Sequence, residues 1–160
     1  GVLGRLCVQT RVSDPRKSLD YCRRASAAEP DNVSHAVNFG AALVQTRQFD
    51  SAIGLFRRLL QIAPDNYAAH ANLASALFET NRFAEARTEF LWLAEKKPEL
   101  SITYYFLAIL HDQMGEYVDA LANYQKFLEL ADAKQNRLEI DKVNLRLPGV
   151  RKLAKEKGKK

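Results

Sequence analysis

Residues 64–100 read PDNYAAHANLASALFETNRFAEARTEFLWLAEKKPEL, and this stretch determines the fold. The same pattern returns 34 residues earlier and 34 residues later. Prolines at positions 30, 64 and 98 keep that spacing, as do aromatic residues at positions 56, 90 and 124. A fixed period of this length is the signature of stacked structural repeats, so the chain is predicted to be a repeat array.

Each repeat is predicted to form two helices. In the quoted stretch Asn66 is a good N-cap residue, and residues 67–79 carry apolar side chains at helical spacing without Pro or Gly. Asn81 suits the end of this helix, because asparagine tolerates the left-handed backbone conformation. Residues 83–95 form the second helix, which Pro98 stops. A lone helix pair cannot bury its apolar face, so neighbouring pairs must complete the core.

The aligned repeats resemble the tetratricopeptide repeat family. In each repeat a small residue follows Leu or Phe, and an alanine stands four positions before an aromatic residue, as in the family pattern. The small residues are Gly40, Ala74 and Ala108, and the alanine–aromatic pairs are Ala52 with Phe56, Ala86 with Phe90 and Ala120 with Tyr124. The resemblance implies an all-α, right-handed α-solenoid of antiparallel helix pairs, closed by a C-terminal capping helix.

The periodicity divides the chain into a regular array with two atypical ends. The Ser-Asp-Pro sequence at 13–15 is a helix-start signal, so residues 14–29 are expected to be the second helix of a degraded first repeat. The Pro-Gly pair at 148–149 is expected to end the last helix. The predicted segments are a partial N-terminal repeat (1–30), three full repeats (31–64, 65–98 and 99–132), a capping helix (133–149) and a basic tail (150–160).

The chain contains two cysteines, Cys7 and Cys22. Cys22 falls at the repeat position of Phe56 and Phe90, so it is predicted to be a small, buried, apolar residue with a free thiol. Pairing with Cys7 is left open. Two cysteines indicate neither a disulfide-rich scaffold nor a metal site.

The net charge of +5 is concentrated near the C-terminus. Residues 146–160 carry seven basic residues and one glutamate, whereas the rest of the chain is close to neutral. This tail has no aromatic residues for base stacking, so a solubilising role is favoured over contact with nucleic acid or an anionic membrane. No stretch approaches the ~18 uncharged apolar residues of a membrane span, and no secretory signal is visible. A cytoplasmic location is favoured, although a chain that begins with Gly1 is also consistent with a processed or excised fragment.

The sequence predicts no enzyme, no cofactor, no metal site and no small-molecule substrate. His35, His70 and His111 fall at three different places of the repeat. Zinc binding and general-base catalysis need convergent ligands or an orienting partner, so each histidine is interpreted as structural. The sequence also lacks a phosphate-binding Gly-rich loop, a nucleophile elbow and a Cys-x-x-Cys motif.

The resemblance implies that the first helices of the pairs line a concave groove for a peptide or an amphipathic helix. Asn38 and Asn72 share one repeat position and are expected to hold the backbone of an extended ligand. Tyr105 and Phe106 are the expected anchors, since a few aromatic residues usually dominate binding energy. The carboxylate clamp of some family members is not expected, because only Asn72 matches its pattern. The predicted groove residues are Val37, Asn38, Ala41, Gln45, Asn72, Ser75, Phe78, Glu79, Tyr105, Phe106, Ile109 and Gln113.

The favoured function is a non-catalytic protein–protein interaction module, an adaptor or scaffold. One alternative is a docking segment of a larger enzyme or of a secretion or assembly component. Another is contact of the basic tail with nucleic acid or an anionic membrane. Trp92 is a candidate for an interface on the convex side, self-association stays open, and the groove side chains could instead pack against one another or against residues 1–12.

Overall fold

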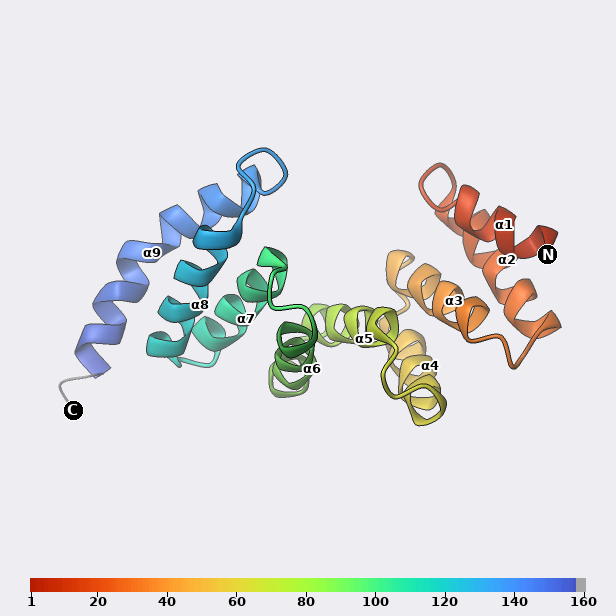
Figure 1. Ribbon diagram of the computed structural model, residues 1–160, viewed down its shortest axis with the longest axis horizontal. Helices are drawn as coiled ribbons and strands as arrows, with labels where there is room; N and C mark the ends of the chain where they lie inside the picture. Colours follow the sequence, from red (N-terminus) through yellow and green to blue (C-terminus); the bar gives the residue numbers. More distant parts are fainter. Residues whose placement is uncertain (158–160) are drawn as a thin grey trace. The chain divides into compact units, whose positions relative to one another are not determined.

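The computed structural model describes residues 1–157, and α-helices joined by short turns make up this part of the chain (Figure 1). The helices divide into two compact units, Gly1–Arg82 and Phe83–Lys160. The predicted helix over residues 67–79 is confirmed, and the other pairs begin and end within a few residues of their expected bounds. The helices are α1 (Val2–Gln9), α2 (Pro15–Ala28), α3 (Val33–Gln45), α4 (Phe49–Ile62), α5 (Tyr67–Glu79), α6 (Phe83–Lys96), α7 (Ser101–Gln113), α8 (Tyr117–Leu130) and α9 (Arg137–Lys157).

The caps of α3 and α5 repeat with the sequence period. Asn32 and Asn66 accept hydrogen bonds from the backbone N–H three residues further on, at 3.2 and 2.9 Å between N and Oδ1. Thr46 and Thr80 close the same two helices through hydroxyls that donate to the carbonyl four residues back, both at 2.8 Å. Each cap satisfies a terminal backbone group, so these side chains define where the helices begin and end.

The turns after α3, α5 and α7 each contain a residue in the left-handed conformation. Arg47, Asn81 and Gly115 hold equivalent repeat positions and have φ angles of 61°, 58° and 75°. Glycine adopts this conformation at little cost, whereas a residue with a Cβ atom is strained by roughly 1–2 kcal/mol. Arg47 and Asn81 therefore adopt the same turn conformation as Gly115, although their Cβ atoms make it less favourable.

In α5 and α7 a side chain hydrogen-bonds to the backbone carbonyl of the proline at the end of the preceding repeat. His70 Nε2 lies 2.7 Å from the Pro64 carbonyl oxygen, and the Tyr104 hydroxyl donates to the Pro98 carbonyl at 2.8 Å. The two pairs are equivalent in the repeat, so a histidine and a tyrosine serve the same backbone acceptor. This contact supports the structural interpretation of His70.

Within the Gly1–Arg82 unit, α3 and α4 pack closely because Gly40 faces Phe56. The Phe56 side chain is fully buried, and a Cβ atom placed on Gly40 would lie 2.3 Å from its Cζ atom. In the second unit the equivalent residues, Ala108 and Tyr124, belong to one buried cluster. The small residue of the repeat pattern thus leaves room for the aromatic ring of its partner helix.

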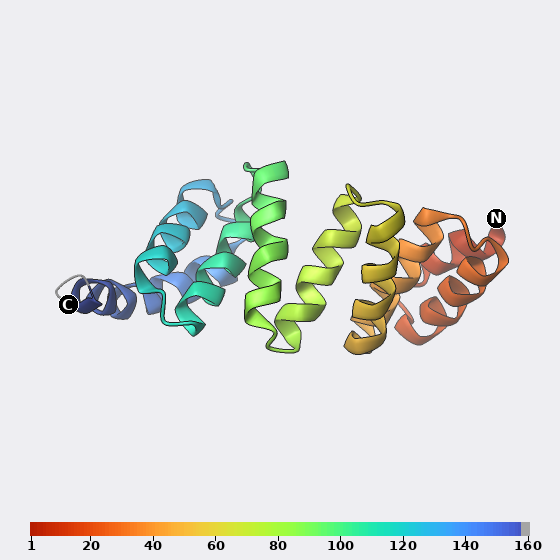
Figure 2. The same cartoon turned by 90° about the horizontal axis from the view of Figure 1, so that it is seen from below.

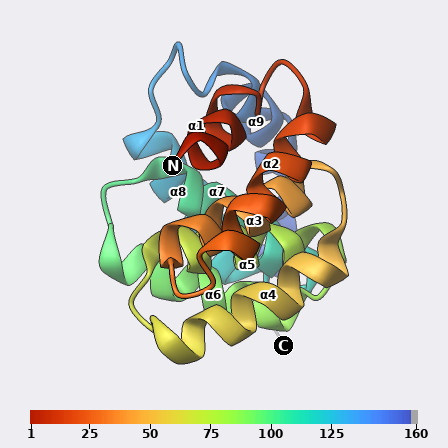
Figure 3. The ribbon, with the colours of Figure 1, turned by 90° about the vertical axis from the view of Figure 1, so that its right-hand side faces the viewer.

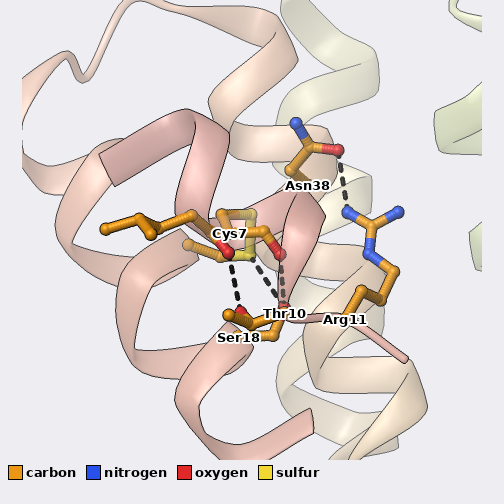
Figure 4. Close-up of a disulfide and its surroundings, with 7 residues drawn as sticks. Cys7, Thr10, Arg11, Ser18 and Asn38 are labelled. Carbon is orange, nitrogen blue, oxygen red and sulfur yellow. Dashed lines mark hydrogen bonds between the residues drawn. A yellow bond between two sulfur atoms is a disulfide. The ribbon is translucent and has the colours of Figure 1, made fainter. Parts of the chain in front are cut away.

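The first helix pair is joined by a disulfide between Cys7 and Cys22 (Figure 4). The expectation of a free thiol at Cys22 is therefore wrong, although its burial was predicted correctly. α1 and α2 pack against each other (Figure 3), and the Ser18 hydroxyl donates to the Cys7 carbonyl between them at 2.7 Å. Disulfides persist chiefly in oxidising compartments.

In the second unit α7 packs against α8, and α9 packs along α8 (Figure 1; Figure 2). The expectation that the last helix ends at the Pro-Gly pair is wrong, because α9 continues past Pro148 to Lys157. Val150 and Ala154 extend the buried face of the helix beyond the proline. Full burial of a side chain such as Val150 contributes about 1.5–3 kcal/mol, which offsets much of the roughly 3 kcal/mol cost of an interior proline. Residues 158–160 of the predicted tail lie outside the described residues.

The solvent side of α9 is basic, with Arg151, Lys152 and Lys155 exposed. α9 is 21 residues long. Neither it nor another helix within residues 1–157 combines the length and the apolar character needed to cross a bilayer.

The packing of Gly40 beneath Phe56 predicts opposite effects for two glycine substitutions. Gly40→Ala should lower the free energy of unfolding by about 1–3 kcal/mol, because the new methyl group overpacks the contact. Gly54→Ala is the matched control, since a Cβ atom there meets only the end of the Arg58 side chain at 3.6 Å. It should raise stability by roughly 0.5–1 kcal/mol through helix propensity. Urea unfolding followed by circular dichroism measures both, and a neutral or stabilising Gly40→Ala would contradict the packing.

The disulfide predicts that the first helix pair depends on the oxidation state of the chain. Its cysteines are 15 residues apart, and closing a loop of that length contributes about 3 kcal/mol. A reductant should therefore lower the free energy of unfolding by an amount of that order in the natural chain. A Cys7→Ser/Cys22→Ser variant should have a lower free energy of unfolding than the natural chain, and the reductant should not change it. Equal stability of the natural chain with and without reductant would show that the pair contributes nothing.

Candidate peptide-binding surface

The first helices of the pairs in the Gly1–Arg82 unit, α1, α3 and α5, are neighbours, because α3 contacts both of the others. The predicted groove residues of this unit lie on α3 and α5. None of them is fully buried, and most are small or polar. They are Val37, Asn38, Ala41, Gln45, Asn72, Ser75, Phe78 and Glu79.

The turn after α1 reaches two of these residues. Arg11 Nη2 donates to Asn38 Oδ1 at 3.0 Å (Figure 4). Gln45 Nε2 donates to the backbone carbonyl of Arg11 at 2.8 Å. Arg11 therefore contacts two of the predicted groove residues of α3, and the alternative that residues 1–12 fill part of the groove stays a prediction. Sequence analysis missed Arg11 because the first repeat is out of register with the others.

Two polar groove residues of α5, Asn72 and Ser75, are hydrogen-bonded within their own helix. Asn72 Nδ2 donates to the Ala68 carbonyl at 2.8 Å, and the Ser75 hydroxyl donates to the Ala71 carbonyl at 3.0 Å. These bonds hold the two side chains along the helix. Asn72 Oδ1 accepts no hydrogen bond within residues 1–157, so it can accept one from the backbone of a ligand.

In the Phe83–Lys160 unit Tyr105 is buried, in contrast to the exposed anchor expected from the sequence. It retains 9% of its surface and packs in one cluster with Val143 and Leu147 of α9. Burial, together with the nearby Glu139 carboxylate, raises the pKa of its hydroxyl. Tyr105, which was predicted to anchor a ligand, therefore packs against the capping helix α9 instead.

The other predicted residues of α7 are covered to different degrees. The Phe106 ring stacks on Phe90 with 5.2 Å between ring centroids and meets Tyr105 edge-on at 5.5 Å. Ile109 packs against the cluster beneath α9, and Gln113 is exposed. α7 therefore presents less open surface than α3 and α5.

Asp112 fastens α9 to the helix pair below it. Arg146 donates to both carboxylate oxygens, from Nε at 2.7 Å and from Nη2 at 2.6 Å. The Tyr124 hydroxyl donates to the same carboxylate at 3.0 Å. Burial acts to raise the pKa of Asp112, but the hydrogen bonds from Arg146 and Tyr124 outweigh it and hold the pKa below its ordinary value. At the other end of the helix Lys157 donates to the Gly115 carbonyl.

Trp92 is half-buried rather than fully exposed. The ammonium group of Lys96, one helical turn away, lies 5.4 Å from the centroid of its ring. This cation–π contact uses one face of the indole. An interface at Trp92 stays a prediction.

His111 is a buried histidine with an acidic partner. Its Nδ1 lies 2.6 Å from Glu116 Oε2, and Arg87 Nη1 donates to both Glu116 oxygens at 2.9 Å. Asp119 offers a third ligand atom, and the three ligand atoms of His111, Glu116 and Asp119 all lie within 4.8 Å of one another. A metal ion would have to displace Arg87, whose charge already compensates the carboxylate, so a structural role of His111 is favoured. The hydrogen bonds from His111 and Arg87 lower the pKa of Glu116.

One signal in the sequence could have revealed the full length of the capping helix. The buried residues Val143, Leu147, Val150 and Ala154 keep helical spacing across the proline. The Pro-Gly pair favours termination of the helix, but this periodicity continues past it. The four apolar residues together predict a longer helix, with a continuous buried face that can pack against the preceding helices.

The comparisons with known proteins agree with the helix-pair architecture. Family models described as tetratricopeptide repeat match residues 10–67, 43–101 and 103–138. The chain belongs to the tetratricopeptide repeat family. No curated protein matches the sequence significantly.

Several solved structures are similar to this tetratricopeptide repeat chain. "MamA AMB-1 C2221" is 27% identical with a TM-score of 0.71, and the match covers 81% of this chain and 77% of that one. "MamA 41-end from Desulfovibrio magneticus RS-1" is 18% identical with a TM-score of 0.77, over 99% and 93% of the two chains. The latter likeness concerns the fold alone. Tetratricopeptide repeats are typically non-catalytic, and the family membership makes this chain a protein-interaction module.

The Asp112 network predicts how docking of α9 depends on pH. Asp112→Asn should lower the free energy of unfolding at pH 7 by about 1–3 kcal/mol, because Arg146 and Tyr124 lose a charged acceptor. The folded-state pKa of Asp112 is depressed. Its contribution is therefore present above the ordinary carboxyl pKa of about 4 and is lost as the pH falls through the lower folded value. The natural chain should lose this increment on acidification, and the variant should not.

Hydrogen exchange of the α9 amides locates the effect, and urea unfolding between pH 3 and pH 7 gives its size. Asp141→Asn, on the exposed side of α9, is the matched control. Parallel pH profiles for the natural chain and Asp112→Asn would mean that the network does not hold α9.

Proposed function

We propose that this protein binds an extended segment of a partner protein on the inner surface of α3 and α5 in the Gly1–Arg82 unit. The observation that carries the proposal is the small size and polarity of the side chains there. Asn38, Ala41, Gln45, Asn72 and Ser75 leave room for a ligand backbone to lie close to the helices. Extended peptides are commonly recognised through such backbone contacts, with side-chain pockets supplying specificity.

The repeated asparagine supports the same surface. Asn38 and Asn72 occupy equivalent positions on neighbouring helices. Each retains unused hydrogen-bonding capacity within residues 1–157, a donor on Asn38 and an acceptor on Asn72. Backbone N–H and C=O groups of an extended chain need one of each, so the pair is complementary to a peptide backbone.

The covering of α7 by α9 favours α3 and α5 over the aromatic end predicted from the sequence. A ligand on Tyr105 would have to displace the buried contacts of Val143 and Leu147. A ligand on Asn72 displaces no hydrogen bond to another helix, because the hydrogen bond of Asn72 lies within α5. The helix pairs of the Phe83–Lys160 unit are therefore not needed for the proposed contact.

Selection of peptides from a displayed random library on the purified chain tests the proposal. Selected peptides should bind with a Kd in the micromolar range, about 8 kcal/mol, measured by fluorescence anisotropy. Asn72→Arg should weaken them about tenfold or more by filling the surface, and circular dichroism should show an unchanged fold. Ser51→Arg places the same side chain at an exposed position of α4 and should have no effect.

Two outcomes would overturn the proposal. Peptides that lose affinity with Ser51→Arg but not with Asn72→Arg would place binding on α4 and not on α3 and α5. Binding that is abolished by Arg151→Glu/Lys152→Glu, and that weakens steeply with salt, would assign the function to the basic face of α9.

A further inference from the structure

A cavity of about 480 Å³ opens in the Gly1–Arg82 unit among α2, α3 and α4. Its lining residues come from all three helices, and α3 packs against both of the others. None of these residues belongs to the surface proposed above for the backbone of a peptide. The volume falls in the range of typical ligand pockets, so the cavity can accept a side chain of a partner.

Apolar side chains from the three helices line the cavity. Leu43 of α3 is buried, whereas Leu19, Phe39 and Leu55 are half-buried. Leu19 and Phe39 pack against the buried cluster around the disulfide. The part of these side chains that stays in contact with water lies in the cavity. An apolar group bound there would cover it, and removing apolar surface from water favours binding.

Gly54 lines the cavity at a position where the fold does not require a glycine. It lies inside α4, where glycine is less stable than alanine. A Cβ atom there would meet only Arg58 Nη1, at an ordinary contact distance of 3.6 Å. The equivalent repeat positions hold Thr88 and Ala122. Because glycine lets a ligand approach the backbone closely, the missing side chain leaves room for a bound group.

The uncompensated charge at the rim of the cavity is positive. Arg58 is exposed and takes part in no ion pair within residues 1–157. The other charged lining residues already have partners. Asp50 Oδ1 lies 3.4 Å from Arg82 Nη2, and Arg23 Nη2 lies 2.8 Å from Asp20 Oδ1. An acidic group beside the cavity can therefore pair with Arg58 without displacing an existing ion pair.

We propose that this cavity is a second partner-binding site, which takes one large apolar side chain of a protein segment that carries an acidic residue beside it. The apolar side chain lies over Gly54 and contacts Phe39 and Leu55, as an anchor residue does in a pocket. The acidic residue pairs with Arg58 at the rim. The site goes beyond the function proposed above, because it uses different residues and recognises side chains instead of the ligand backbone.

Selection of displayed random dodecapeptides on the Asn72→Arg chain tests the site, because this variant blocks the surface of α3 and α5. Selected peptides should carry Leu, Ile or Phe within one helical turn of Asp or Glu and should bind with a micromolar Kd. Fluorescence anisotropy measures the affinity. Replacing the apolar residue of a peptide with Ala should weaken binding about tenfold. Replacing the acidic residue with Gln should weaken it about two- to fivefold, as for an exposed ion pair.

Substitutions of Gly54 separate binding from folding. Gly54→Leu fills the cavity and should abolish binding of the selected peptides, and circular dichroism should show an unchanged fold. Thr88→Leu places the same side chain at the equivalent exposed position of α6 and should leave binding unchanged. Gly54→Ala should stabilise the chain and still weaken the peptides. A general loosening of the fold cannot produce these opposite effects.

A substitution of Arg58 tests the acidic preference. Arg58→Gln should remove the difference in affinity between an acidic peptide and its Gln version. Arg57→Gln, at the neighbouring exposed arginine, makes the same change in net charge and should retain the difference. Equal effects of the two substitutions would show that Arg58 does not pair with the ligand, and the acidic part of the proposal would be wrong.

A selection that yields no peptide, or peptides that bind equally with and without Gly54→Leu, overturns the assignment of the cavity. The two surfaces are distinguished on the natural chain. Peptides on α3 and α5 lose affinity with Asn72→Arg, whereas peptides in the cavity lose it with Ser51→Arg, because Ser51 lines the cavity. Absence of the first group alone removes the function proposed above, and absence of the second group alone removes this site.

Discussion

The close approach of α3 and α4 over a small residue is the constraint on which this helix pair depends. Gly40 lets the Phe56 ring lie against the backbone of α3, and no side chain with a Cβ atom fits there without movement. The ring in turn fills the space that would otherwise separate the two helices, and its full burial makes it part of the core. Caps, turns and the braced prolines position the helices, but this contact sets their distance.

Much of the fold could be predicted because its signals are local. Asn66 and Pro98 mark helix ends by their own backbone chemistry, and Asn81 adopts the left-handed conformation that its position suggested. The end of α9 could not be read in this way. Pro148 is a strong local signal for termination, but the burial of Val150 is a tertiary effect that outweighs it.

The predicted groove residues lie on the expected helices, but the sequence did not show which of them other helices cover. The resemblance to the tetratricopeptide repeat family implied that Asn72 and Tyr105 lie on the groove side of the first helices. Whether a neighbour covers that side depends on a segment far along the chain, and α9 covers Tyr105 while Asn72 stays accessible. Arg11 was missed, and the Cys7–Cys22 pairing was left open, because the register of the first repeat is shifted and the facing residues could not be aligned.

The disulfide has a consequence for cooperativity. In a linear array each helix pair is stabilised by its neighbours, and a terminal pair has one neighbour instead of two. Within residues 1–157 α1 and α2 have one neighbouring pair, which they contact through α3, so this pair is prone to fray. Cys7 and Cys22 join these two helices covalently. Unfolding from this end must therefore release both helices together, and the number of helices that behave as one folded array depends on whether the sulfur atoms are bonded.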